Sequence, residues 1–183
     1  MVIIFIILAA LAGAIAFLYN GLVSKRQMAE NGWSDIDVQL KRRADLIPNL
    51  VQTVKAYAKH EKQLFIDVTE KRNLALAAGE NPQARGAAES ALSQPVGRLL
   101  AIAEDYPELK ASQNFLDLQN ELSETEDKIE MARRFYNGAV RELNTTIETV
   151  PSNFIAGPFG FKKRDYFEID PVDAAIPNVE FDT

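Results

Sequence analysis

The chain has 183 residues, a formal net charge of −6, no cysteine and one histidine. The lack of cysteine excludes disulfides and thiolate metal sites, and a zinc site built on one histidine would need three carboxylates, an unusual ligand set. Ten basic and seven acidic residues precede Asn73, a balance of +3, and ten basic and nineteen acidic residues follow from there, a balance of −9. The acidic second half argues against nucleic acid as a partner. The basic first half suits anionic lipid headgroups, unless both halves are simply solvated helix faces.

Residues 2–19 (VIIFIILAALAGAIAFLY) form an unbroken apolar run without charge or proline. At about 1.5 Å per residue, this run makes a helix of roughly 27 Å, close to the hydrocarbon thickness of a bilayer. We therefore predict a transmembrane anchor over residues 1–23. A cleaved signal peptide is the alternative, because small residues at 12–16 resemble a cleavage site, but no basic residue precedes the run.

Lys25 and Arg26 follow the apolar run, with three further basic residues at 41–43. The positive-inside rule therefore predicts a single-pass protein of the cell membrane with its N-terminus outside and its soluble domain in the cytoplasm. Ala9 and Gly13 are four residues apart, as are Ala12 and Ala16, a spacing that permits close packing of two anchors in lipid. Generic anchor composition explains the same small residues equally well.

Residues 24–150 are predicted to form an elongated antiparallel helical bundle. The strongest periodicity has alternating spacings of three and four residues and continues for four heptads, as in a coiled-coil-like helix. One helix over about residues 111–149 would be roughly 60 Å long. Its seam comprises Phe115, Leu118, Leu122, Thr125, Ile129, Ala132, Tyr136, Ala139 and Leu143.

Residues 33–72 show similar spacing and are predicted to be the antiparallel partner of that helix, with a kink or a break at Pro48. A third helical stretch fits residues 82–104, as one kinked helix or as two short ones separated near Pro95, the second capped by Ser93. Half of the eight prolines fall after residue 150. An irregular tail is therefore predicted over residues 151–183, disordered or extended from Ile169 onward.

No motif of catalysis is present: there is no phosphate-binding glycine loop, nucleophile elbow or HExxH sequence. His60 lies among lysines and is best interpreted as a surface residue. We therefore predict a protein that is not an enzyme and that has no cofactor, metal or small-molecule substrate.

Two segments are candidate contacts for lipid or a partner. The first contains Lys41, Arg42 and Arg43, although pairing with nearby aspartates on the same helix is the favoured explanation of these charges. The second is the tail, where Phe154, Phe159 and Phe161 either cap the bundle, the favoured interpretation, or lie against a membrane surface. Asn137 and Asn144, seven residues apart beside the seam, are either buried amides that fix register or exposed side chains.

Several motifs, which together extend from the anchor to about Phe167, resemble the LemA family closely. They are YNGLV (19–23), WSDIDVQLKRR (33–43), DLIPNLV (45–51), YAKHE (57–61), AEDYPELK (103–110), ARRFYN (132–137), PSNFIA (151–156) and GF (160–161). The resemblance implies a bacterial inner-membrane protein with a cytoplasmic helical bundle and without known enzymatic activity or established site residues. Family members often neighbour HtpX-type membrane metalloproteases, and one branch resembles proteins that shape magnetosome membranes.

These observations predict a non-catalytic, membrane-anchored scaffold that self-associates as a homo-oligomer in envelope organisation. The alternative is an adaptor or regulator of a membrane metalloprotease. Membrane lipid is an expected partner in both cases.

Overall fold

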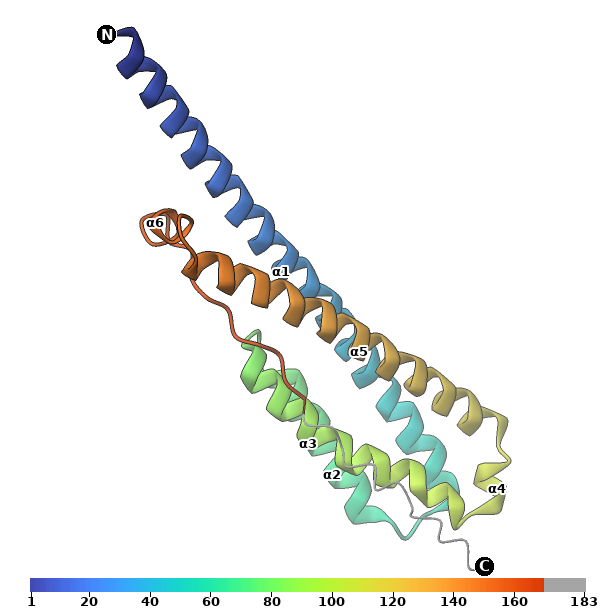
Figure 1. Cartoon of the computed structure of the whole chain (residues 1–183). Coiled ribbons are helices and arrows are strands. Elements are labelled where there is room, and N and C mark those ends of the chain that lie inside the picture. The colour runs from blue at the N-terminus through green and yellow to red at the C-terminus, as the bar shows by residue number, and fades with distance from the viewer. Residues whose placement is uncertain (170–183) are drawn as a thin grey trace, which may run out of the picture. The chain divides into compact units, whose positions relative to one another are not determined.

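The computed structural model describes residues 1–169, and within them every regular element is helical (Figure 1). The all-α prediction is therefore confirmed. Part of the predicted irregular tail, residues 170–183, lies outside the described residues. The helices are α1 (Val2–Tyr57), α2 (Lys62–Ala77), α3 (Pro82–Ala101), α4 (Pro107–Lys110), α5 (Gln113–Glu148) and α6 (Asn153–Ala156), with a 3-10 turn at Ile102–Glu104.

The chain divides into two compact units. The first unit contains Met1–Asp45 and Asn120–Phe167, and the second contains Leu46–Gln119 and the chain from Glu168. The boundaries drawn from the sequence at residues 23 and 150 stay a prediction.

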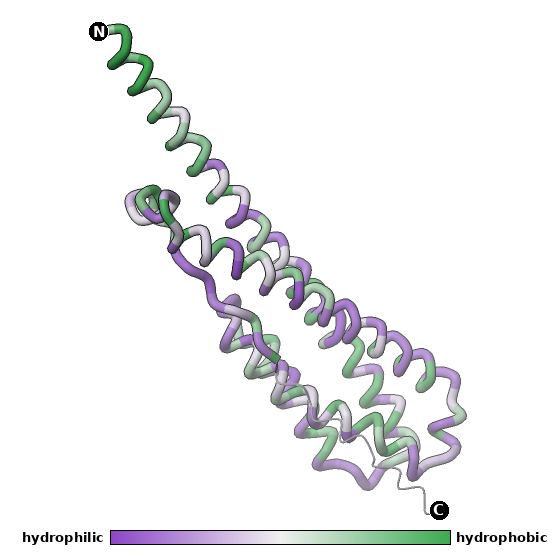
Figure 2. Tube along the Cα trace, viewed as in Figure 1, coloured by the Kyte–Doolittle hydropathy of each residue, from purple (hydrophilic) through white to green (hydrophobic). Residues whose placement is uncertain are grey.

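The first unit begins with the apolar part of α1. Residues 2–17 are all exposed, and they form the hydrophobic start of the trace in Figure 2. This segment is long and apolar enough to cross a membrane. Leu22 is the first fully buried residue, so the bundle core begins directly after the apolar run.

The core of the first unit is a heptad seam between α1 and α5. On α1, Leu22, Ala29 and Ile36 are fully buried at intervals of seven residues. The two helices are antiparallel, because Lys25 pairs with Glu142 whereas Arg43 pairs with Glu126. Helix α5 buries six of the nine predicted seam positions in this unit and a seventh, Phe115, in the second unit; the six are Leu122, Thr125, Ile129, Tyr136, Ala139 and Leu143.

Gly32 lets α1 and α5 approach closely. A Cβ added to Gly32 would lie 3.1 Å from the Cα of Tyr136 and 3.0 Å from the ring of Phe135. The lack of a side chain at Gly32 therefore brings the two backbones together at the level where Trp33 stacks on Tyr136, with ring centroids 5.5 Å apart.

Of the two alternatives predicted at Pro48, a kink or a break, the break is wrong: α1 continues through Pro48 to Tyr57, and the chain turns at residues 58–61. Proline removes one backbone hydrogen bond from a helix. Ile47, Leu50 and Val54 are nevertheless all fully buried on this stretch. The burial of one continuous apolar face therefore outweighs the loss of that bond.

In the second unit α2 packs against α3, and the two helices bury Phe65, Val68, Leu92 and Leu99. Helix α3 passes through Pro95 without dividing, which decides between the two predicted alternatives in favour of a single helix. The Ser93 hydroxyl donates to the Glu89 carbonyl inside that helix and caps nothing.

Both ends of α3 have clear local causes. Asn81 caps its N-terminus, accepting a hydrogen bond from the Ala84 amide at 2.8 Å, and Pro82 occupies the first turn, where its missing N–H costs nothing. The helical path ends at Glu104, ahead of Pro107, as predicted.

Within α3, Gly86 lies directly against the Glu168 carbonyl, and no side chain would fit between them.

Candidate functional site: an aromatic turn and a strap beside the anchor

After α5 the chain reverses through an aromatic turn, residues 151–160, which includes α6 (Figure 1). Ile155 and Ala156 are buried, whereas Phe154 and Phe159 are 69% and 55% exposed. Gly160 has a φ of +74°, a left-handed conformation that favours glycine and reverses the chain. The turn therefore presents two large apolar rings to its surroundings.

The aromatic turn packs against the end of the apolar segment of α1. The ring of Tyr19, the last residue of that segment, lies 5.1 Å from the ring of Phe159 and 5.7 Å from that of Phe161. The Arg26 guanidinium lies 5.3 Å from the centroid of the Phe161 ring, within cation–π range. Aromatic and cationic side chains together are typical of the boundary between hydrocarbon and headgroups.

From Phe161 the chain continues as an extended strap, residues 161–167, which runs along α5. The side chain of Asn144 accepts from the Arg164 amide and donates to the Arg164 carbonyl, both at 2.9 Å. Asn137 makes the same two bonds with Phe167, also at 2.9 Å. Each asparagine thus imitates a neighbouring strand and satisfies the strap's backbone at two points.

The spacing of the two asparagines fits an extended chain. Seven residues of helix span about 10.5 Å, and three residues of extended chain, from Arg164 to Phe167, span about 10 Å. The strap can therefore meet both amides only when it is extended and antiparallel to α5. Between these two docked positions of the strap, the Asp165 carbonyl accepts a hydrogen bond from the Tyr136 hydroxyl at 2.9 Å.

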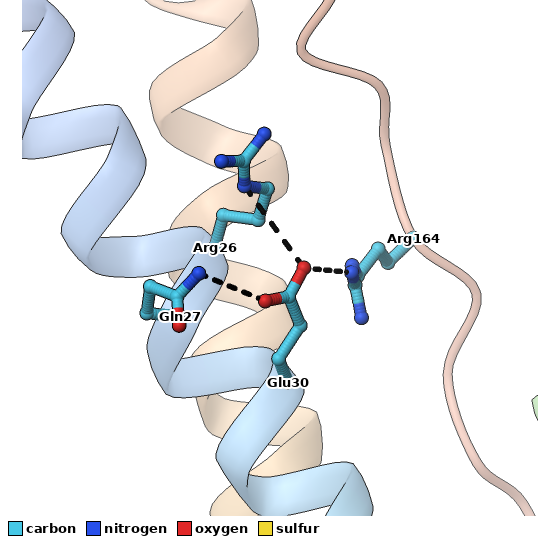
Figure 3. Close-up of polar contacts among 4 residues, drawn as sticks. All are labelled: Arg26, Gln27, Glu30 and Arg164. Carbon is cyan, nitrogen blue, oxygen red and sulfur yellow. Dashed lines mark hydrogen bonds and ion pairs between the residues drawn. The ribbon is translucent and has the colours of Figure 1, made fainter.

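Side chains of α1 complete the binding of the strap. The Glu30 carboxylate accepts from Arg164 at 2.7 Å and from Gln27 at 3.0 Å, and it lies 3.9 Å from Arg26 (Figure 3). Farther along, the Phe167 ring is fully buried beside Trp33, with ring centroids 5.5 Å apart.

Three titratable groups on α5 have shifted pKa values. Burial raises the pKa of the Tyr136 hydroxyl above its usual value, although the Arg164 charge opposes this shift. A hydrogen bond from Lys25 lowers the pKa of Glu142, and one from Arg134 lowers that of Glu130. These pairs hold exposed charges in place and do not form a reactive centre.

The structure separates the residues that the sequence grouped as candidate contacts. Lys41 and Arg42 are exposed, as are Phe154 and Phe159. Arg43 is 1% exposed and pairs with Glu126 at 3.1 Å, so its charge forms an ion pair within the bundle. Phe161 is buried against Tyr19 and Arg26 and is an internal contact.

Sequence reasoning did not identify Tyr19, Glu30 or Arg164 as parts of this site. It did single out Asn137 and Asn144, but for a possible role in register, and their real partners are backbone atoms of the tail. Among residues 1–169, no group of three or more His, Cys, Asp or Glu side chains lies close enough to hold a metal ion. The arrangement can dock a peptide segment and face a lipid surface.

Comparison with known proteins places this architecture. The chain is 26% identical to the magnetosome protein MamQ 2 of Paramagnetospirillum magneticum, over 93% of this chain and 72% of that protein. It is 25% identical to MamQ of Magnetospirillum gryphiswaldense, over 90% and 70%, and 27% identical to the protein LemA of Metamycoplasma hominis, over 93% and 78%. The LemA family model matches residues 32–181, which include most of the bundle, the aromatic turn and the strap. The chain therefore belongs to the LemA family.

Proposed function

We propose that this chain is a non-catalytic, membrane-anchored helical scaffold that self-associates in the bacterial inner membrane. The observation that carries this proposal is the continuity of α1. The helix passes from a fully exposed apolar segment of membrane length into the bundle seam at Leu22 without any linker. A rigid connection of this kind suits a protein that fixes the position of its bundle at the membrane.

Self-association is supported by apolar side chains that the first unit leaves exposed. Met131 and Phe135 are one turn apart on the same side of α5 and are 61% and 49% exposed. In the anchor, a Cβ added to Gly13 would meet no other atom, so a second helix has room to approach there.

The bundle is proposed to lie in the cytoplasm. The sequence alone sets two basic residues, Lys25 and Arg26, close to the apolar segment. The fold brings Lys162 and Lys163 to the same end, because they follow Phe161, whose ring meets Tyr19. Lys162 and Lys163 are too far along the chain to count in the positive-inside rule, which rests on Lys25 and Arg26, but all four cations suit the anionic headgroups of a cytoplasmic leaflet. Relatives named as magnetosome proteins also support a membrane-associated role.

Photo-crosslinking in intact membranes tests the proposal. A photoreactive residue replaces Met131 or Phe135, with Ser123, another exposed position on α5, as the control. The scaffold predicts products at multiples of the 20.4 kDa chain from the first two sites and much weaker ones from Ser123. A product with one other protein, such as a membrane protease, would instead support the adaptor function. The absence of self-products would contradict the scaffold.

A further inference from the structure

A groove of about 740 Å³ lies in the second unit, between the last turns of α1 and the first half of α2. Phe65 is buried and Ile66 is 49% exposed, and with Val51 they give the groove an apolar floor. Lys55, Lys59 and Lys62 are exposed and line the same groove. Thr69 and Glu70 complete the lining.

The groove has a positive electrostatic potential. Three lysines face one glutamate among the lining residues. Glu61 is the N-cap residue of α2, but its side chain caps no backbone amide and no acidic residue lies in the first turn, so the lysines remain the main charges beside this end of the 16-residue helix. Apolar floor and cationic rim together favour a ligand that is both apolar and negatively charged.

We propose that this groove docks an acidic amphipathic helix of a partner protein. A small-molecule site fixes its ligand with a few polar groups placed deep in the pocket. Here the charged groups are exposed lysines on flexible stems, which attract and orient a macromolecular partner without fixing single atoms. The partner helix would place its apolar residues over Phe65 and Ile66 and its carboxylates beside the lysines.

The experiment uses the full chain in nanodiscs of zwitterionic lipid and a fluorescent helical peptide of about 15 residues, with leucines on one face and glutamates beside them. Fluorescence anisotropy measures the dissociation constant. We expect saturable binding to the natural chain. The triple variant Lys55→Glu, Lys59→Glu, Lys62→Glu should weaken binding at least about tenfold, as should Ile66→Asp, which places a charge on the floor.

The matched control reverses the same number of charges elsewhere: Lys41→Glu, Lys128→Glu, Lys162→Glu. Equal weakening by this control would show that the peptide responds to net charge alone and would overturn the proposal. Circular dichroism confirms that each variant stays helical, and Ile66→Ser provides a milder test of the floor.

Anionic vesicles are added in a parallel flotation assay. If the groove variant loses vesicle binding and keeps peptide binding, the groove belongs to a lipid surface and the proposal is wrong.

Discussion

Arg43 carries a positive charge into the seam between α1 and α5. It follows Ile36 by seven residues and precedes Leu50 by seven, and all three side chains are 1% exposed or less. Lys41 and Arg42, its immediate neighbours, are exposed, because successive residues of a helix point about 100° apart. Three consecutive basic residues therefore have two different roles, and only Arg43 belongs to the core.

Truncation of Arg43 is expected to destabilise the bundle strongly. Arg43→Ala leaves a cavity and removes the ion pair with Glu126, whose half-exposed side chain water can hydrate, so we expect a loss of about 2 kcal/mol in the free energy of unfolding, mainly from lost packing. Arg42→Ala, at the exposed neighbouring position, should change it by less than about 0.5 kcal/mol. Denaturant unfolding in detergent, followed by circular dichroism, measures both values. Equal effects of the two substitutions would contradict the buried role of Arg43.

The buried hydroxyl of Tyr136 predicts a loss of stability in alkali. Burial raises the pKa of Tyr136 in the folded state, whereas in the unfolded chain it stays near 10. The unfolded state thus loses its proton first, so this contribution to stability is complete below about pH 10 and falls as the pH rises through the folded-state pKa. Tyrosinate absorbance should show a late-titrating component that Tyr136→Phe removes. The same titration with Tyr57→Phe, at an exposed tyrosine, is the control and should keep the late component.

At the scale of elements, the sequence predicts the helices well where periodicity alone decides them. The helix predicted over about residues 111–149 from this seam agrees with α5 within two residues at its start and one at its end. The sequence predicts a kink or a break at Pro48 because proline is a local helix breaker, whereas the helix continues there because burial on both sides of Pro48 is a property of the packed unit. The true turn at residues 58–61 contains neither proline nor glycine.

The strap is the element whose docking the sequence could not predict. Its residues have no periodicity, and its hydrogen bonds join backbone atoms to side chains 20 and 30 residues away. The one available signal was the interval between Asn137 and Asn144, which also fits a buried register pair. Only knowledge that the chain reverses at residues 151–160 selects the correct partners.

Removal of the two asparagines should release the strap. Asn137→Ala with Asn144→Ala removes four hydrogen bonds, and because water can replace the bonds of the half-buried strap we expect a cost of about 1–3 kcal/mol. Hydrogen exchange should lose protection at the amides of Arg164 and Phe167 and keep it within α5. Asn120→Ala, at an exposed position on the same helix, should change neither. Unchanged protection of the strap in the double variant would contradict the clamp.

At the scale of the whole molecule, the region around Tyr19 is assembled from two distant parts of the chain. The apolar segment comes from the start of α1, and the exposed phenylalanines come from a turn more than 130 residues later. The two parts are in contact at Tyr19, so the aromatic rings of the turn lie beside the end of the apolar segment. If a bilayer surrounds the apolar segment, we expect it to contact the aromatic turn as well, and burial of these rings in lipid would stabilise the closed arrangement of turn and strap.

The aromatic turn is accordingly expected to lie at the lipid boundary. We replace Trp33 with Phe and introduce one tryptophan, at Phe159 or at Phe154, in chains reconstituted with lipids brominated near the headgroup. Both tryptophans should be quenched strongly. Met131→Trp is the control, because Met131 lies 17 residues before the end of α5, about 25 Å along the helix, and should be quenched several-fold less. Equal quenching at Phe159 and Met131 would remove the turn from the membrane surface. If the turn does rest there, Phe154→Ser alone should raise hydrogen exchange in the strap, because lipid would no longer hold the turn in place, whereas the direct contact of Phe159 with Tyr19 is kept.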